Sequence, residues 1–271
     1  MAAHTKRPLD GRVAVVAGGS MGFGEQIAAR LVADGARVVI AARDAERLEA
    51  AATRLGAVGI RCDISDSAAV KAVADQTVER LGRLDIAVNS AGYTDRSPIA
   101  ELEPERVERM ISVQLTGALY FIQHMANAMA STEPRGGSVV SISSLTATLV
   151  AEGYAPYAAS KAGLNHASKI AASEYGPAGV RVNVVSPTVI RTPMTQPVFE
   201  RPGMVAATLA ETPLGRIGEI DDVVGAVSFL VSDDATYITG QNIHIDGGTS
   251  LRRLPRREDY ARHAEAAAKK E

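Results

Sequence analysis

The chain contains few of the residues that mark several classes of protein. It has one cysteine, Cys62, so it cannot form an intrachain disulfide, and this fits a reducing compartment. Tryptophan is absent and aromatic residues make up 4% of the chain, which argues against a stacking platform for single-stranded nucleic acid. The formal net charge of -2 provides no bulk attraction to nucleic acid or to an anionic membrane. The composition therefore argues against partners of either kind.

Signals for targeting and for metal binding are also missing. Residues 1–11 lack the apolar core of a signal peptide, and no apolar run is long enough to span a bilayer. The five histidines are scattered, without an HExxH pattern, and a single cysteine excludes a CxxC pair. We therefore expect a cytoplasmic protein that holds no metal.

The chain is instead organised as short Val/Ile-rich runs that alternate with longer amphipathic stretches. Runs that are apolar throughout are typical of strands buried on both faces, and their alternation with helices indicates a parallel, doubly wound sheet. No stretch between these units resembles a linker, so we expect a single α/β domain. The expected strands cover residues 12–18, 36–42, 57–63, 84–92, 136–144, 180–187 and 241–248, and the expected helices cover about 22–34, 44–55, 66–82, 104–130, 154–175 and 219–231.

A glycine-rich turn follows the first strand and opens the first helix. Gly18, Gly22 and Gly24 allow positive φ angles and a close approach of the backbone to a ligand. The free N–H groups and the dipole at a helix start favour a pyrophosphate. Ligands of such sheets bind beyond the carboxyl ends of the strands, where this turn lies. The alternative is a glycine-rich turn that binds nothing.

The end of the second strand bears on the type of dinucleotide. A carboxylate there would bind the adenosine ribose of NAD, whereas a basic group suits the 2′-phosphate of NADP. Asp44 lies about twenty residues beyond the last glycine, as an NAD-type acid would, but it also stands where the next helix needs a cap. Arg43 precedes it and can bind a phosphate with its guanidinium group. We favour the capping role for Asp44 and NADP as cofactor, with NAD as the alternative.

Tyr157 and Lys161 form the candidate proton-transfer pair. They are four residues apart, so they share one face of the expected helix. A phenol has an ordinary pKa of about 10, and a nearby ammonium group lowers it toward the range that a general acid–base needs. Ser143 and Ser144 end the fifth strand, where a hydroxyl group can polarise a substrate carbonyl. The alternative is that these serines satisfy backbone groups of the loop.

Several motifs occur together in a fixed order after the glycine turn. They are NSAG (89–92), ISS (142–144), YAASK (157–161), SPTVIRTPM (186–194), PLGRIGEIDDV (213–223) and YITGQNIHIDGG (237–248). Over residues 9–249 the chain resembles the classical short-chain dehydrogenase/reductase family. The resemblance implies a seven-stranded Rossmann sheet in one dinucleotide-binding and catalytic domain, 9–249, with a nicotinamide cofactor and a homotetrameric assembly. The charged segment 250–271 extends beyond it.

The resemblance also implies roles for individual residues. Tyr157 is the general acid in ketone reduction and the base in alcohol oxidation, and Lys161 lowers its pKa and hydrogen-bonds the nicotinamide ribose. The family's serine lies thirteen positions before the tyrosine, which selects Ser144 over Ser143. The positions that match cofactor contacts are Gly18, Ser20, Met21, Gly22 and Gly24 in the turn, Arg43 at the second strand, Asp63 with Ile64 at the adenine, Asn89 and Gly92 at its ribose, and Ile190 and Thr192 at the carboxamide.

Gln114 stands where the family usually has asparagine. That asparagine helps to hold a water molecule that connects to the lysine. Glutamine keeps the amide but adds a methylene group, and our hypothesis is that Gln114 still serves, at some loss of rate. We therefore predict that Gln114→Asn leaves turnover equal or higher; a large drop in kcat would show a separate role for the glutamine.

The expected reaction is reversible hydride transfer between a nicotinamide and a ketone or secondary alcohol. Apolar residues in the expected substrate lid, 195–212, suggest a medium-sized, apolar substrate of the 3-oxoacyl, alicyclic or steroid-like kind. The alternatives are an NAD-dependent alcohol dehydrogenase and a non-catalytic nucleotide-binding sensor or scaffold. For residues 252–271 we expect a solvated, frayed tail, with docking as a helix near the substrate mouth or on a neighbouring subunit as the alternative.

Overall fold

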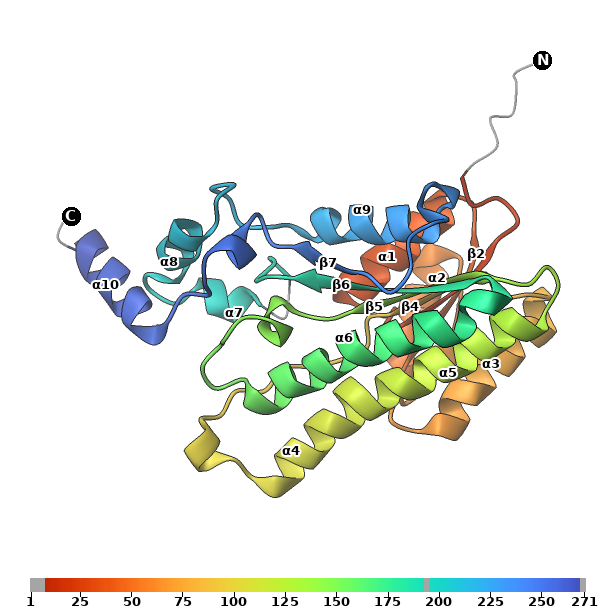
Figure 1. Ribbon diagram of the computed structural model, residues 1–271, viewed down its shortest axis with the longest axis horizontal. Helices are drawn as coiled ribbons and strands as arrows, with labels where there is room; N and C mark the ends of the chain where they lie inside the picture. The colour runs from red at the N-terminus through yellow and green to blue at the C-terminus, as the bar shows by residue number, and fades with distance from the viewer. Residues whose placement is uncertain (1–7, 193–194, 269–271) are drawn as a thin grey trace, which may run out of the picture.

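The computed structural model describes residues 8–192 and 195–268, and its centre is one parallel sheet (Figure 1). The strand order is β3-β2-β1-β4-β5-β6-β7, with every neighbouring pair parallel. This is the doubly wound seven-stranded sheet that the sequence predicts. The strands are β1 (Val13–Ala17), β2 (Arg37–Ala42), β3 (Val58–Arg61), β4 (Ile86–Asn89), β5 (Gly137–Ile142), β6 (Val180–Pro187) and β7 (Asn242–Ile245).

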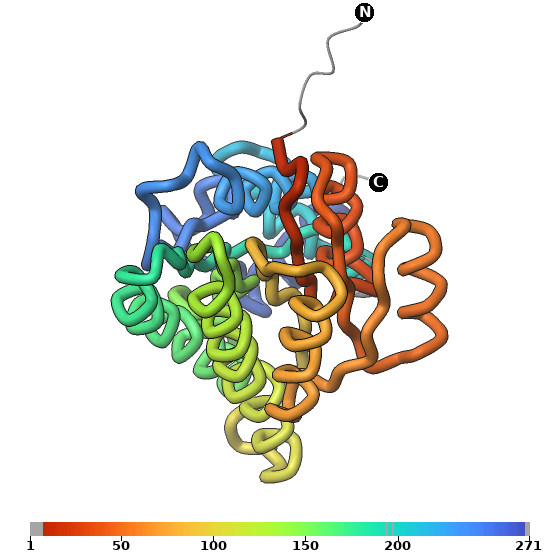
Figure 2. Tube along the Cα trace, turned by 90° about the vertical axis from the view of Figure 1, so that its right-hand side faces the viewer, coloured from red at the N-terminus to blue at the C-terminus, as the bar shows by residue number. Residues whose placement is uncertain are grey.

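Helices cover both faces of the sheet. One face is packed by α1 (Gly22–Ala33), α2 (Ala45–Leu55) and α9 (Ile220–Val231), and the other by α3 (Ser67–Leu81), α5 (Gly117–Ser131) and α6 (Ala155–Tyr175). In Figure 2, α5 and α6 in green lie on the side of the sheet opposite α1 in red and α9 in blue. Crossovers in both directions from β1 produce this arrangement and bring the ends of β1 and β4 side by side.

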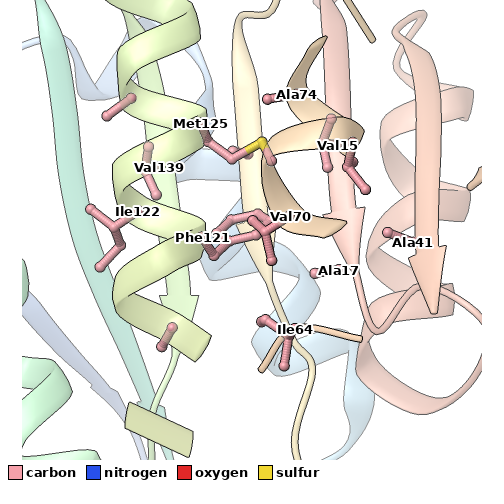
Figure 3. Close-up of a cluster of buried hydrophobic side chains, with 14 of the residues drawn as sticks. Val15, Ala17, Ala41, Ile64, Val70, Ala74, Phe121, Ile122, Met125 and Val139 are labelled. Atoms are coloured by element: carbon pink, nitrogen blue, oxygen red, sulfur yellow. The ribbon is translucent and has the colours of Figure 1, made fainter. Parts of the chain in front are cut away.

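Alternate side chains of each strand enter different cores. Val15 of β1 packs with Phe121 and Met125 of α5, as Figure 3 shows, whereas Ala14 and Val16 face the opposite cluster. Because both faces are buried, the strand is apolar at every position, which explains the continuous Val/Ile runs in the sequence.

The helix expected over 104–130 is divided in the structure. It consists of α4 (Pro104–Ile111), a π-helical turn (Ser112–Thr116) and α5. π-helical turns shift the register of the residues that follow and occur frequently at functional sites. Gln114 lies in the middle of this turn and is 2% exposed.

The expected frayed tail is wrong for the described part of the C-terminal segment. Residues 257–268 form α10 (Arg257–Ala268), which packs on α8 (Met204–Glu211) in the expected lid region, next to the short α7 (Gln196–Phe199) (Figure 1). Gly203 permits this close packing, because its φ is +73° and an added Cβ would collide with the backbone of Tyr260. Asp259, which is 3% exposed, accepts hydrogen bonds from the Arg253 side chain and from Arg256 N.

Deletion of the chain after Ser250 is expected to lower the melting temperature, because it exposes the α8 surface and removes the Asp259 contacts. A loss of at least about 1 kcal/mol corresponds to about 2–4 °C for a domain of this size. Differential scanning calorimetry measures the change, and a chain ending at Ala268 is the matched control because it keeps all of α10. Equal melting temperatures for the two truncated chains would contradict the packing role of α10.

None of the helices within 8–192 and 195–268 combines the length and the apolar character needed to cross a membrane.

Candidate active site

A cavity of about 770 Å³ lies along the carboxyl ends of the strands. It extends from the glycine turn after β1 to α8 and the start of α10. Most of the residues that the sequence analysis assigned to the site lie in its wall: Gly18, Ser20, Met21, Gly22, Arg43, Asp63, Ile64, Gly92, Gln114, Ser144, Tyr157, Lys161, Ile190 and Thr192. Gly24 and Asn89 do not line the cavity but contact residues that do, at Gly18 and Ala91.

Each of the three positions in the turn is glycine for a different structural reason. Gly18 has a φ of +74°, and an added Cβ would lie 2.7 Å from Ala91 N in the loop after β4. Gly24 sits where α1 crosses the turn, and an added Cβ would collide with the Gly18 carbonyl. Gly22, with a φ of +57°, faces open space. Met21 occupies the N-cap position of α1 and makes no side-chain hydrogen bond to the helix. The backbone N–H groups of the first turn of α1 can therefore bind an anion, and the turn fits the pyrophosphate of a dinucleotide.

Two arginines flank the end of β2. Asp44 caps α2, since its Oδ1 accepts a hydrogen bond of 3.0 Å from Arg47 N, and this confirms the capping role. Arg43 is half-exposed, with Nη1 4.0 Å from Asp63 Oδ2. Arg47 also lines the cavity, and the sequence analysis missed it. The available signal was its position in the first turn of the helix, four residues beyond Arg43.

Asp63 and Asn89 shape the loops that surround the adenosine end. Asp63 Oδ1 accepts hydrogen bonds from Ser65 N (3.0 Å) and Ser65 Oγ (2.7 Å). Burial acts to raise the pKa of Asp63, but these hydrogen bonds together with Arg43 lower it overall. Asn89 is 4% exposed, and its Oδ1 accepts a hydrogen bond of 3.1 Å from Ala91 N. Both residues hold the backbone that lines the cavity.

Gln114 reaches from the π-helical turn to the loop after β4. Its Nε2 donates a hydrogen bond to the Tyr93 carbonyl, and its amide fills the space beside Gly92, where an added Cβ would lie 2.8 Å from it. Its Oε1 is buried without a hydrogen-bond partner among the residues that the structure describes. The Gln114 side chain thus connects the π-helical turn to the loop after β4. The effect of Gln114→Asn on turnover stays a prediction, to be measured as kcat at saturating substrate.

The two serines after β5 have different surroundings. Ser143 is buried, and its hydroxyl donates toward the Lys161 carbonyl at 3.5 Å. Ser144 is half-buried, and its Oγ accepts hydrogen bonds from Thr146 N (3.2 Å) and Thr146 Oγ1 (3.0 Å). Because its partners here are donors, the Ser144 hydroxyl keeps its own proton available for an oxygen in the cavity. The catalytic role of Ser144 stays a prediction.

Tyr157 lies in the first turn of α6 and Lys161 in the second, on the same face of the helix. Lys161 Nζ is 5.7 Å from the centroid of the Tyr157 ring, so the two side chains converge as their spacing predicts. Lys161 is 5% exposed, and its Nζ donates a hydrogen bond of 2.9 Å to the carbonyl of Ile142 at the end of β5. The ammonium group is thereby fixed between α6 and the strand that delivers Ser144.

The expected direction of the pKa shift of Tyr157 is wrong in this structure. Burial raises the pKa of Tyr157 to about 12, against a smaller lowering by the Ser144 hydroxyl. Burial likewise lowers the pKa of Lys161 to about 8. Both shifts have one physical cause, since removal from water disfavours the charged form of each group. The lysine donates its hydrogen bond to the Ile142 carbonyl rather than to the phenol.

Ile190 and Thr192 border the cavity on the side of β6. Ile190 is 2% exposed and pairs with Gly218 in an isolated bridge. Thr195 Oγ1 donates to the Ile190 carbonyl at 2.6 Å and accepts from Thr192 N at 2.9 Å. These contacts fix the start of the lid segment beside the catalytic residues. Pro193 and Met194, which belong to the matched motif, lie outside the described residues.

Comparison with known proteins agrees with this geometry. The family described as enoyl-(acyl carrier protein) reductase matches residues 17–250. The chain is similar to D-threitol dehydrogenase of Mycolicibacterium smegmatis, with 37% identity over 90% of this chain and 95% of that protein. It is also similar to 3-oxoacyl-(acyl-carrier-protein) reductase of Escherichia coli, with 35% identity over 89% of this chain and 98% of that protein.

Solved structures show the same architecture. A short-chain type dehydrogenase/reductase from Mycobacterium ulcerans superposes with a TM-score of 0.89 at 33% identity, covering 92% of this chain and 93% of that one. A structure described as a putative short-chain alcohol dehydrogenase from Sinorhizobium meliloti superposes with a TM-score of 0.85 at 35% identity, covering 91% and 99%. The chain therefore belongs to the short-chain dehydrogenase/reductase family, whose members use a nicotinamide cofactor, and it is an oxidoreductase acting on CH–OH or carbonyl groups.

Proposed function

We propose that the chain catalyses NADP-dependent, reversible interconversion of a medium-sized ketone and its secondary alcohol. The observation that supports this most strongly is the convergence of Ser144, Tyr157 and Lys161 on the cavity that the glycine turn also lines. Val198 and Met204 line the same cavity from the lid, which favours a substrate with an apolar portion. A non-catalytic sensor would not need all three polar groups in one cavity.

Each catalytic side chain has a distinct task. The nicotinamide, when bound, supplies hydride for reduction and accepts it in oxidation. In reduction, Tyr157 donates its phenolic proton to the carbonyl oxygen, and Ser144 donates a second hydrogen bond that stabilises the developing negative charge. With a pKa raised to about 12, Tyr157 is protonated throughout the neutral range and ready to act as the acid. Lys161 stabilises the phenolate that proton transfer leaves behind.

The preference for NADP is supported by the two arginines at the end of β2. Arg43 and Arg47 line the cavity there, while Asp44 is engaged as the cap of α2. A guanidinium group binds a phosphate with paired hydrogen bonds, whereas a ribose diol would require a carboxylate in this place. The NAD-dependent alcohol dehydrogenase is the alternative proposal. The carboxylate nearest the end of β2 is that of Asp44, which caps α2 and lies 3.5 Å from Arg47 Nε.

Replacing Arg43 and Arg47 together by alanine is expected to raise KM for NADPH by about 10- to 100-fold, because two charged hydrogen-bond donors to the 2′-phosphate are lost. KM for NADH is expected to stay within a few-fold of its original value. The matched control is Arg54→Ala, on the same helix, whose guanidinium group pairs with Glu25 outside the cavity. A preference for NADH in the original protein would contradict the proposal.

We also propose a cytoplasmic homotetramer. Ile111, Leu119 and Ile170 are apolar side chains exposed by 40–50% on α4, α5 and α6, and a subunit contact over these helices would cover them. Light scattering of the purified protein tests the assembly, and a monomer at micromolar concentration would contradict it.

The proposed reaction is tested with purified protein, NADPH or NADH, and a panel of ketones and secondary alcohols. Turnover is followed by the absorbance of the reduced nicotinamide. The proposal requires turnover of at least one pair in both directions. Dinucleotide binding without turnover of any compound would instead favour the sensor.

A further inference from the structure

The cavity is lined by three arginines besides the two at the end of β2. Arg96 belongs to the loop after β4, Arg201 to the segment before α8 and Arg257 to the start of α10. The acidic residues that line the cavity are Asp44 and Asp63, after β2 and β3, and Glu152. The local excess of positive charge does not follow from the composition, since the whole chain carries a formal charge of -2.

The three guanidinium groups form no ion pair with a carboxylate in the part of the chain that the structure describes. Nearby acids are engaged elsewhere. Asp95, adjacent to Arg96, is paired with Arg106, and Asp259 below the cavity is paired with Arg253. No carboxylate among the described residues therefore neutralises these arginines where they line the cavity.

Arg96 is held at a defined position relative to the catalytic tyrosine. Its Cζ lies 5.7 Å from the centroid of the Tyr154 ring, and that ring packs edge-on against Tyr157 with centroids 6.2 Å apart. Gly153 makes room for the arginine, because an added Cβ there would lie 2.8 Å from Arg96 Cγ. A hydrogen bond of 2.9 Å from Ser97 N to the Gly153 carbonyl joins the two loops. The guanidinium group thus lies one aromatic ring away from the proton donor.

Arg201 lines the same cavity from the segment before α8. Tyr260 of α10 also lines it and is close enough to feel both charges: burial raises its pKa, and the charges of Arg96 and Arg201 both oppose that shift. The Tyr260 hydroxyl donates to the Pro255 carbonyl at 3.3 Å, which orients the ring against the cavity. The docked α10 thus contributes Tyr260 and Arg257 to a cavity that Arg96 and Arg201 also line.

We propose that the substrate carries an anionic group, a carboxylate or a phosphate, that Arg96 and Arg201 bind while its carbonyl or alcohol carbon lies at Tyr157. Arg257 adds a third positive charge at the rim, and Val198, Met204 and Leu254 contact the apolar portion between the two ends. Guanidinium groups bind both anions in a bidentate manner, with charge-assisted hydrogen bonds. This inference rests on the proposed function and names the substrate class of the same site.

The test uses matched pairs of compounds. One series contains oxocarboxylates of increasing chain length, each paired with its methyl ester, and the other contains oxoalkyl phosphates, each paired with the parent hydroxyketone. For at least one pair, kcat/KM of the anion is expected to exceed that of the neutral partner by about 10- to 100-fold, which corresponds to one or two charged hydrogen bonds. The series with the larger ratio identifies the anion.

The Arg96→Gln/Arg201→Gln variant is expected to reduce this ratio to within a few-fold of one, through a higher KM for the anion. Its kcat/KM for the neutral partners is expected to fall by less than its kcat/KM for the anions, and its KM for NADPH is expected to stay within a few-fold of the original value. Arg201→Gln alone, at an exposed side chain that cannot endanger the fold, is expected to lose part of the preference. The matched control is Arg135→Gln, which removes the same charge from an exposed loop outside the cavity.

Two results would overturn the inference: equal kcat/KM for anion and neutral partner in the original protein, or an unchanged preference in the double variant. Turnover of neutral ketones with no gain from the anion would leave the proposed function standing and remove only this inference. If no compound turns over, calorimetric titration with the oxocarboxylates and oxoalkyl phosphates tests whether the anion-binding site exists. Binding by the original protein that the double variant loses supports the anion site, and lack of binding overturns it.

Discussion

Replacement of Tyr157 by phenylalanine is expected to lower kcat by about 10²- to 10⁴-fold, the usual contribution of a positioned general acid. The change removes one hydroxyl group and keeps the ring, so the edge-on packing against Tyr154 and the position of Lys161 persist. Steady-state kinetics measures the loss of turnover. The dissociation constant of the dinucleotide, measured by fluorescence titration, is expected to stay within a few-fold of its original value.

Tyr175→Phe is the matched control for this change. It makes the same substitution on the same helix, α6, where the hydroxyl donates a hydrogen bond of 2.8 Å to Asn127 at the surface and does not line the cavity. Its turnover is expected to remain unchanged. Activity of Tyr157→Phe comparable to that of this control would show that another group supplies the proton and would remove the catalytic assignment.

Replacement of Lys161 by methionine is expected to abolish most of the activity and to stabilise the fold at neutral pH. The activity falls because the positive charge beside the developing phenolate is lost. The free energy of unfolding rises in the variant because the original protein keeps a buried ammonium group there. Lys161 is 5% exposed and makes one hydrogen bond, to the Ile142 carbonyl. Methionine fills a similar volume without a charge to desolvate.

The pH dependence of this effect has a defined sign. Burial lowers the pKa of Lys161 from 10.5 to about 8, so between these values the unfolded chain binds more protons than the folded one. The buried ammonium group of Lys161 therefore lowers the free energy of unfolding by about 3 kcal/mol below pH 8, and this loss disappears as the pH rises to 10.5. Loss of the hydrogen bond to Ile142 offsets about 1 kcal/mol of the gain in the methionine variant.

Denaturant unfolding of both proteins over this pH range measures the effect. The difference in the free energy of unfolding between Lys161→Met and the original protein is expected to be largest near neutral pH and to shrink above pH 8. Other groups titrate in the same range, and subtraction of the two curves removes their contribution. A difference that does not change with pH would show that Lys161 is not desolvated as its burial indicates.

The raised pKa of Tyr157 and the lowered pKa of Lys161 describe a site that disfavours the charged form of both groups. Tyr157, with a pKa of about 12, is a weak acid until its proton moves to an oxygen that becomes negatively charged. Lys161, with a pKa of about 8, is close to the point where it can hold or release a proton. Such paired shifts in one cavity are typical of acid–base sites.

The sequence by itself determined the seven strands, the helices on both faces and the proximity of Tyr157 to Lys161. Each of these depends on a local pattern: continuous apolar runs for strands buried on both sides, glycines at a turn with positive φ, and a spacing of four residues for one helix face. Tyr157 and Lys161 are near neighbours in the chain, so no long-range contact was needed to bring them together. The capping role of Asp44 was predictable in the same way, from its position directly before α2.

Only the tertiary structure decided what depends on segments distant in the chain. The direction of the Tyr157 pKa shift reversed because the surrounding elements bury the phenol, and spacing along a helix carries no information about that burial. The contact of Gln114 with Tyr93 requires the π-helical turn, and the packing of α10 on α8 requires Gly203 to admit the backbone near Tyr260. Burial, and the set of charges that face one cavity, result from packing between remote segments, which a local pattern does not record.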